Sequence, residues 1–174
     1  MNTLPRLLFL AAGLAFSLAT AWSQTTIFTA TLTGGQEVPA NGSSGTGSGT
    51  LEINNTSRAW TLSGTFSGLS GTANNAHIHG PAAVGVGAGV VVGISFTSGT
   101  SGTISGTGTF TSGQASDLFA GLYYINIHST VESGGEIRGQ LTAIPEPSSY
   151  AMIVGLLGLG IAFQRQRKVL KAQN

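Results

Sequence analysis

The sequence predicts an all-β fold, an antiparallel β-sandwich or Greek-key barrel of about eight strands. Glycine accounts for 27 of the 174 residues, only 7% are charged, and Ser and Thr are abundant. Short alternating runs rich in Val, Ile and Phe are separated by Gly, Asn and Pro turns, which is typical of such folds. The chain has no cysteine, so it has neither disulfides nor thiolate metal ligands.

The strands follow from alternation, because successive side chains of a strand point to opposite faces. The segment 34–39 has turn residues, and 41–49 is a glycine- and serine-rich loop. Turn residues at 54–57 join two strands into a hairpin. The expected strands cover residues 26–33, 49–54, 58–66, 76–79, 90–96, 104–110, 122–128 and 136–143.

Three of these segments carry more specific expectations. The run 90–96 is almost continuously apolar, so we expect a buried strand. Residues 114–120 lack β-branching and predict one helical turn, with Ser112 as N-cap. The last two strands, 122–128 and 136–143, are expected to close the domain as a hairpin.

Residues 1–23 have the features of a secretory signal peptide. Arg6 supplies the positive charge, residues 7–18 form the apolar region, and small residues precede Gln24. Signal peptidase is therefore an expected partner. The alternative is a retained N-terminal anchor, although the apolar run is short for a membrane span.

The other end of the chain predicts a membrane anchor. Prolines end the sheet in the linker 144–149, which contains Pro145, Glu146 and Pro147. The segment 150–164 is apolar and predicts a single transmembrane helix, and the basic tail 165–174 is expected to stay in the cytoplasm. The β domain would then lie outside. The alternative is a buried core helix, but such helices are usually amphipathic.

The charge of the domain argues against nucleic acid as a partner. Between Gln24 and Pro147 there are two basic and six acidic residues, a net charge of −4 with His neutral. Nucleic-acid binding depends on basic surfaces that contact phosphates.

Three strands concentrate the polar side chains of the domain. His77 and His79 share one strand face, with Ile78 opposite. A second strand places Tyr124, Asn126 and His128 on one face. A third is expected to do the same for Glu136, Arg138 and Gln140. These stretches contain every histidine of the chain.

Three interpretations of this polar face are open. His77, His79 and His128 could bind Zn or Cu, since both metals favour imidazole, with Glu136 as a fourth ligand or as a partner that orients a ring. Alternatively, the face holds a structural polar network that fixes strand register. A plain solvated sheet face is the third interpretation. The expected network consists of Asn126, Glu136, Arg138 and Gln140.

No complete catalytic set is recognisable, so we expect a protein that is not an enzyme. No serine lies in a Gly-x-Ser-x-Gly turn, and the glycine-rich loop 85–89 lacks the lysine of a phosphate-binding loop. Glu37 with Glu136 is a conceivable carboxylate pair for glycoside cleavage. Glu37 is otherwise a turn residue or the ion-pair partner of an arginine.

Residues 24–143 resemble the CHRD domain, known from chordin and from exported bacterial proteins. The resemblance implies a β-sandwich-like fold but no particular reaction. It is carried by four motifs in the expected order, at 32–39, 76–81, 121–128 and 134–141.

The C-terminal segment resembles a PEP-CTERM sorting signal. The matching features are the Pro-Glu-Pro motif, the short apolar helix and the basic cluster. The resemblance implies processing by an exosortase-type membrane protease, and delivery to the cell surface or an extracellular matrix. We therefore expect a displayed, non-catalytic module that contacts polysaccharide or surface proteins, with a small exported metalloprotein as the alternative. The sorting residues are Pro145, Glu146, Pro147, Arg165 and Arg167.

Overall fold

A computed structural model describes residues 25–145 of the chain. The expected signal peptide, the apolar helix at 150–164 and the basic tail at 165–174 lie outside the described residues. Of the sorting motif, only Pro145 is described, and it is exposed. Within this described part, no helix has the length and apolar character needed to cross a membrane.

The described residues form one antiparallel sheet that nearly closes into a barrel, which confirms the predicted fold class. The strand order is β5-β4-β8-β9-β1-β2-β3-β7-β6, and β10 pairs with β1. The strands are β1 (Thr25–Thr33), β2 (Thr46–Asn54), β3 (Ala59–Ser67), β4 (Ala73–His79), β5 (Val90–Gly93), β6 (Ser95–Phe96), β7 (Gly102–Thr109), β8 (Tyr124–Ser129), β9 (Ile137–Gln140) and β10 (Thr142–Ala143).

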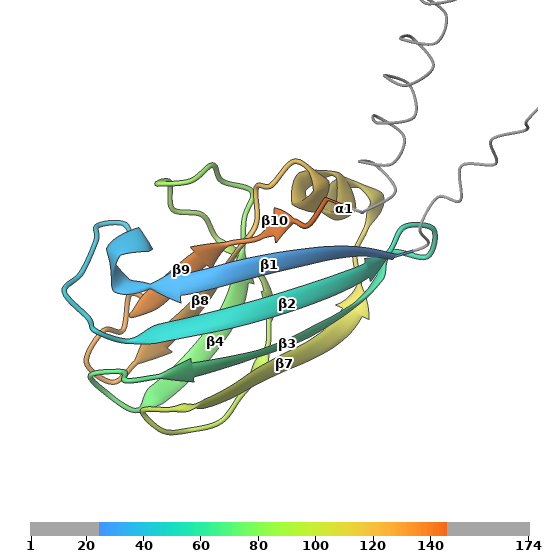
Figure 1. Cartoon of the computed structure of the whole chain (residues 1–174). Helices are drawn as coiled ribbons and strands as arrows, with labels where there is room; N and C mark the ends of the chain where they lie inside the picture. The colour runs from blue at the N-terminus through green and yellow to red at the C-terminus, as the bar shows by residue number, and fades with distance from the viewer. Residues whose placement is uncertain (1–24, 146–174) are drawn as a thin grey trace, which may run out of the picture.

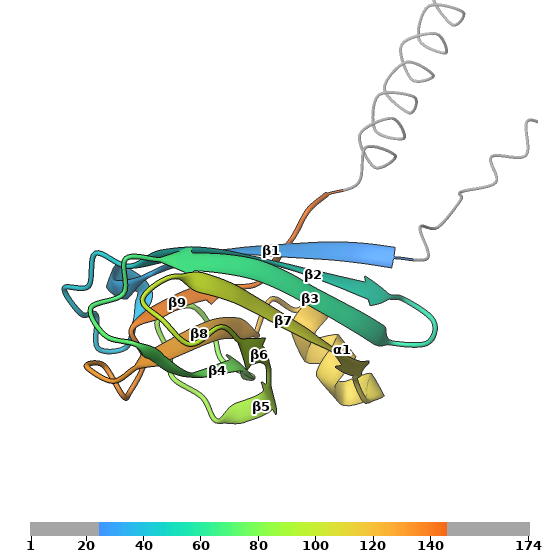
Figure 2. The same cartoon turned by 90° about the horizontal axis from the view of Figure 1, so that it is seen from below.

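The sheet folds into two layers with the core between them. Strands β1, β2, β3 and β7 form one layer, and β4, β8 and β9 lie behind it (Figures 1 and 2). Apolar residues at alternate positions face the interior, as the sequence pattern predicts. The fully buried side chains include Phe28, Leu32, Leu51, Ile53, Ile78, Ile104, Ile125, Ile127 and Ile137.

The run 90–96 does not form the single buried strand that its composition predicts. It is divided into β5, which pairs with β4, and β6, which pairs with β7. These strands lie at the two ends of the strand order, so the chain crosses from one sheet edge to the other at Ile94. Ile94 is buried, whereas Val90 is 55% exposed, because edge strands have a neighbour on one side only.

The helical turn expected at 114–120 is a longer helix, α1 (Ser112–Phe119). Its N-cap is Thr111 rather than Ser112, and Thr111 forms a reciprocal capping box with Gln114. Leu118 is fully buried, and the Phe119 ring packs edge-on against Phe28 at 5.6 Å between centroids. The helix therefore covers one end of the two layers (Figure 2).

The segments on either side of the polar face also differ in detail from the expectation. Residues 34–36 form a short 3-10 helix, η1 (Gly34–Gln36). Strand β2 begins at Thr46, within the expected loop. The last hairpin is present as β8 and β9, but the chain then leaves β9 at Leu141, and β10 pairs with β1 instead.

Candidate metal centre

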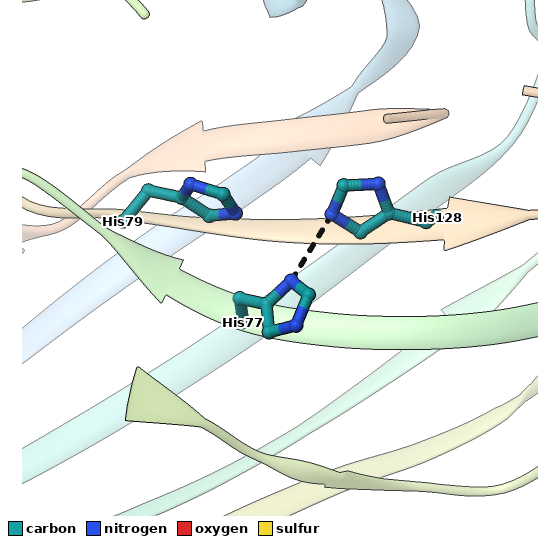
Figure 3. Close-up of side chains that lie close together, drawn as sticks. All are labelled: His77, His79 and His128. Carbon is teal, nitrogen blue, oxygen red and sulfur yellow. Dashed lines mark hydrogen bonds between the residues drawn. The ribbon is translucent and has the colours of Figure 1, made fainter. Parts of the chain in front are cut away.

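Strands β4 and β8 bring the three histidines together. They are neighbours in the sheet, with His77 opposite Asn126 and His79 opposite Tyr124. His128, two residues beyond Asn126, therefore lies diagonally from His77 on the same face. Figure 3 shows the three rings turned toward one another above these two strands. The apolar side chains of Ile78 and Ile127 take the opposite face, where both are fully buried.

The spacing of the three rings is close to that of a metal site. Nδ1 of His77 lies 3.2 Å from Nε2 of His128. One potential ligand atom from each ring lies within 4.8 Å of the others. Two nitrogens on one tetrahedral Zn²⁺ are about 3.4 Å apart, given Zn–N bonds of about 2.05 Å. To bind one ion, the two ring nitrogens that lie farthest apart must approach each other by up to about 1.4 Å. Rotation of the partly exposed rings of His77 and His128 can supply this shift.

Backbone carbonyls orient two of the rings. Nδ1 of His79 lies 3.0 Å from the Ala88 carbonyl oxygen, and Nδ1 of His128 lies 3.0 Å from that of Ser133. A carbonyl only accepts, so each Nδ1 carries the proton in the neutral ring. Nε2 of both rings therefore carries a lone pair. That of His79 has no hydrogen-bond partner among the described residues, and that of His128 accepts from Nδ1 of His77. A metal-binding histidine commonly has its second nitrogen fixed in this way.

The surroundings of His77 and His79 favour the neutral form of their rings. The pKa of His77 is lowered from 6.5, first by burial and then by the neighbouring rings of His128 and His79. The pKa of His79 is also lowered, mainly by burial, although its bond to the Ala88 carbonyl acts in the opposite direction. Neutral imidazole is the form that binds metals, so both rings are ready to act as ligands near pH 7.

A stack of side chains supports His79. The Tyr124 ring lies parallel to the His79 ring, with 5.1 Å between centroids and 9° between planes. The guanidinium carbon of Arg138 lies 3.5 Å from the Tyr124 centroid, within the range of a cation–π interaction. The Tyr124 hydroxyl accepts a hydrogen bond from the Ala88 amide at 3.0 Å. These contacts restrict the position of the His79 ring.

Two residues of the expected network hold the loop at 81–89 over this face. Arg138 donates to the Val86 carbonyl at 2.7 Å. Gln140 donates to the carbonyls of Ala82 and Gly121, at 3.0 and 2.7 Å. Most of the loop is exposed, but the carbonyls of Ala82 and Val86 accept hydrogen bonds from side chains of β9. The loop thereby covers part of the polar face (Figure 1).

Asn126 belongs to a different contact, with Glu37. Its amide donates to Glu37 Oε2 at 3.5 Å, and both side chains pack onto the Cα of Gly135. A Cβ at Gly135 would lie 2.6 Å from the Asn126 amide and 2.8 Å from Glu37 Oε1, and its φ is +135°, so glycine is required there. Burial raises the pKa of Glu37 to about 7, against the opposing attraction of Arg138.

Glu136 lies apart from both groups, contrary to the expectation that it shares a face with Arg138 and Gln140. It precedes β9, in the turn that follows Gly135, and its side chain is fully buried. Its Oε1 accepts hydrogen bonds from the Ser43 hydroxyl, at 2.7 Å, and from the Ser70 amide. Glu136 is therefore placed neither to complete the histidine group nor to pair with Glu37.

The polar face thus divides into separate units. The three histidines converge, whereas the four residues of the expected network take part in three different sets of contacts. The interpretation as a plain solvated face is wrong, since Tyr124, Asn126 and Arg138 are each less than 5% exposed. Segments 34–38 and 81–89 lie over this face.

Sequence reasoning did not identify the groups that orient the rings. The carbonyls of Ala88 and Ser133 belong to loops, and no side-chain pattern marks a carbonyl acceptor. Tyr124 was expected on the polar face, but its stacking on His79 depends on strand register. For Gly135 the sequence does contain a signal, namely the paired glycines that precede Glu136.

A family model for the CHRD domain matches residues 28–141, well over half of the chain. The chain belongs to the CHRD domain family. The matched part of this CHRD domain runs from β1 to Leu141, and it contains all three histidines together with Glu37 and Arg138. Neither the curated proteins nor the solved structures include a match to the chain.

Proposed function

We propose that this CHRD domain binds one transition metal ion, Zn²⁺ or a copper ion, through His77, His79 and His128. The supporting observation is the convergence of three imidazoles, two of which have Nδ1 bound to a carbonyl so that Nε2 carries the lone pair that a metal would bind. Imidazole is a preferred ligand of both metals.

The donor set favours these metals over calcium and magnesium. Calcium and magnesium prefer oxygen ligands, and the group contains nitrogen donors only. Three protein ligands also leave a coordination position for water or another small ligand. We propose binding rather than catalysis as the role of the site, because the sequence has no recognisable catalytic set.

The first prediction is a stoichiometric metal site that depends on all three rings. Full-length protein, purified in mild detergent without an affinity tag, is expected to bind about one equivalent of Zn²⁺ or Cu²⁺ and to melt at a higher temperature when loaded. Replacing any one histidine with Gln is expected to weaken binding by about 100-fold or more, since two ligands remain. Isothermal titration and thermal melts measure both effects.

The control for these variants is Glu52→Gln, which replaces an exposed carboxylate on β2. This variant should bind metal like the wild type. Binding of less than about one-tenth of an equivalent, with no change in melting temperature on adding either metal, would contradict the proposed site.

We also propose that the domain is exported and displayed at the cell surface or in an extracellular matrix. The support comes from the sequence: a signal-peptide pattern at 1–23, the Pro-Glu-Pro motif, and the apolar segment followed by basic residues. Signal peptidase and an exosortase-type protease are the proposed processing partners. Extracellular polysaccharide or surface proteins are the proposed binding partners of the displayed domain.

The second prediction concerns this processing. In the native host, we expect the protein outside the cytoplasm, lacking both the leader and the apolar C-terminal segment. Replacing Pro145, Glu146 and Pro147 with Ala should leave an uncleaved form in the membrane fraction. Fractionation with mass spectrometry of the termini measures both outcomes. An intact chain in the cytosol would exclude the export proposal without affecting the metal site.

A further inference from the structure

We infer that the trihistidine site prefers monovalent copper: it binds Cu⁺ more tightly than Cu²⁺ or Zn²⁺. The inference rests on the proposed metal site, and it specifies the charge of the ion that this site prefers. Its basis is a site with three neutral ligands, no anionic ligand and a buried, fixed cation nearby.

The ligands do not compensate the charge of a metal ion. The converging group contains three imidazoles and neither thiolate nor carboxylate. Glu136 is directed to Ser43 and Ser70 instead. Glu37 contacts Asn126, and near pH 7 it has only part of its negative charge, since burial raises its pKa to about 7. A bound ion therefore keeps nearly its full charge at this site.

Arg138 adds a positive charge that cannot move away. It is 3% exposed, and it is held by the Val86 carbonyl and the Tyr124 ring rather than by a carboxylate. Tyr124 stacks in turn on His79, so the guanidinium is only one ring removed from a ligand. Coulomb repulsion grows in proportion to the charge of the ion, so this arginine opposes a divalent ion twice as strongly as a monovalent one.

Burial on the His79 side of the site strengthens this discrimination. His79 is 8% exposed, and its Nε2 is buried without a hydrogen-bond partner among the described residues. Figure 3 shows this ring directed toward His77 and His128. In surroundings poorer in water, a divalent ion loses more hydration energy than a monovalent ion, and the dielectric screening of Arg138 is weaker. A dry protein shell is known to tune the reduction potential of a metal in this way.

The test measures the affinity of the full-length protein for each ion separately. Cu⁺ is titrated without oxygen against the chromophoric chelator bicinchoninate, and Cu²⁺ and Zn²⁺ are titrated against nitrilotriacetate. We expect Cu⁺ to bind at least tenfold more tightly than either divalent ion. For copper, a tenfold ratio corresponds to a reduction potential about 59 mV above that of the aqueous couple.

Equal or tighter binding of Cu²⁺ or Zn²⁺ would overturn the inference while leaving the proposed metal site intact. No binding of any of the three ions would overturn both. The two failures are therefore distinguishable in a single set of titrations, and the wild-type protein alone provides the decisive ratio.

Two variants test the origin of the preference. Arg138→Met removes the charge and keeps much of the side-chain volume, so the ratio of Cu⁺ to Cu²⁺ affinity should fall several-fold. Arg138→Lys keeps a positive charge and should preserve most of the ratio. An unchanged ratio in a folded Arg138→Met protein would contradict the assigned role of this arginine. If that variant does not fold, the wild-type ratio still decides the inference.

Discussion

Replacing Glu136 with Ala is expected to lower the free energy of unfolding by about 3 kcal/mol, a large effect for a single substitution. The Glu136 side chain is fully buried. The substitution removes the acceptor of the Ser43 hydroxyl and of the Ser70 amide, and leaves these donors without a partner. These contacts link residues 43, 70 and 136, which belong to three separate connections of the sheet.

The same carboxylate should make the protein sensitive to acid. Burial alone would raise the pKa of Glu136, but hydrogen bonds from Ser129, Ser43 and Ser70 outweigh it, so the pKa is lowered from 4.5. The folded state therefore holds its proton less tightly than the unfolded state. The stabilising contribution is present above pH 4.5 and is lost as the pH falls through the lower, folded pKa.

Urea unfolding of the wild type and the variant between pH 3 and pH 7 measures both effects. Glu136→Gln keeps an acceptor oxygen and should cost less than Glu136→Ala. Glu52→Ala removes an exposed carboxylate and serves as the matched control, with an expected change within about 0.5 kcal/mol. If Glu136→Ala and Glu52→Ala were equally stable, the hydrogen bonds of Glu136 to Ser43 and Ser70 would not stabilise the fold.

Glu37 should show the opposite dependence on pH. Replacing it with Gln is expected to raise the free energy of unfolding above pH 8 by up to about 3 kcal/mol, since a pKa shift of one unit corresponds to about 1.4 kcal/mol. Burial raises the Glu37 pKa from 4.5 to about 7, although Arg138 and Asn126 favour the ionised form. The folded state therefore binds the proton more tightly than the unfolded state.

The sign of the effect follows from this difference. The contribution of Glu37 to the free energy of unfolding of the wild type is greatest below pH 4.5. It falls as the pH rises toward and through 7. The Oδ1 atom of Asn126 has no hydrogen-bond partner in the described structure, so it can accept from the protonated acid. An amide at position 37 provides the same donor at every pH.

Unfolding curves of the wild type and Glu37→Gln from pH 4 to pH 9 measure this effect. The difference between the two proteins isolates Glu37, because the lowered pKa values of His77 and His79 affect both and act in the opposite direction below pH 6.5. A stability difference that does not change with pH would show that Glu37 ionises normally. The measurement is made without metal, so that binding does not contribute.

The two glutamates show why burial alone does not determine the behaviour of a carboxylate. Both are less than 10% exposed. Glu136 accepts strong hydrogen bonds from neighbouring donors, which favour the charged form. The bond that Glu37 receives from Asn126 is long, at 3.5 Å, so burial outweighs it. The sequence places Glu37 in a turn and Glu136 at the start of a strand, but it does not show how differently the two carboxylates are hydrogen-bonded.

The sequence alone determined the fold class, most strand positions and the faces of the histidines. These properties depend on local alternation and on turn residues, which are readable along the chain. His77 and His79 could be assigned to one face of their strand, and His128 to the polar face of another, because residues two apart in a strand share a side of the sheet. Likewise, the CHRD motifs were visible as short sequences, and the family match over 28–141 confirmed them.

Only the tertiary structure decided which polar groups meet. The division of 90–96 between two sheet edges depends on closure of the barrel, which local composition does not encode. Glu136 turns to Ser43 and Ser70 because it precedes β9 in a turn, and the carbonyls of Ala88 and Ser133 reach the histidines through the path of two loops. Strand periodicity fixes the side to which a residue points, whereas long-range pairing fixes its neighbours.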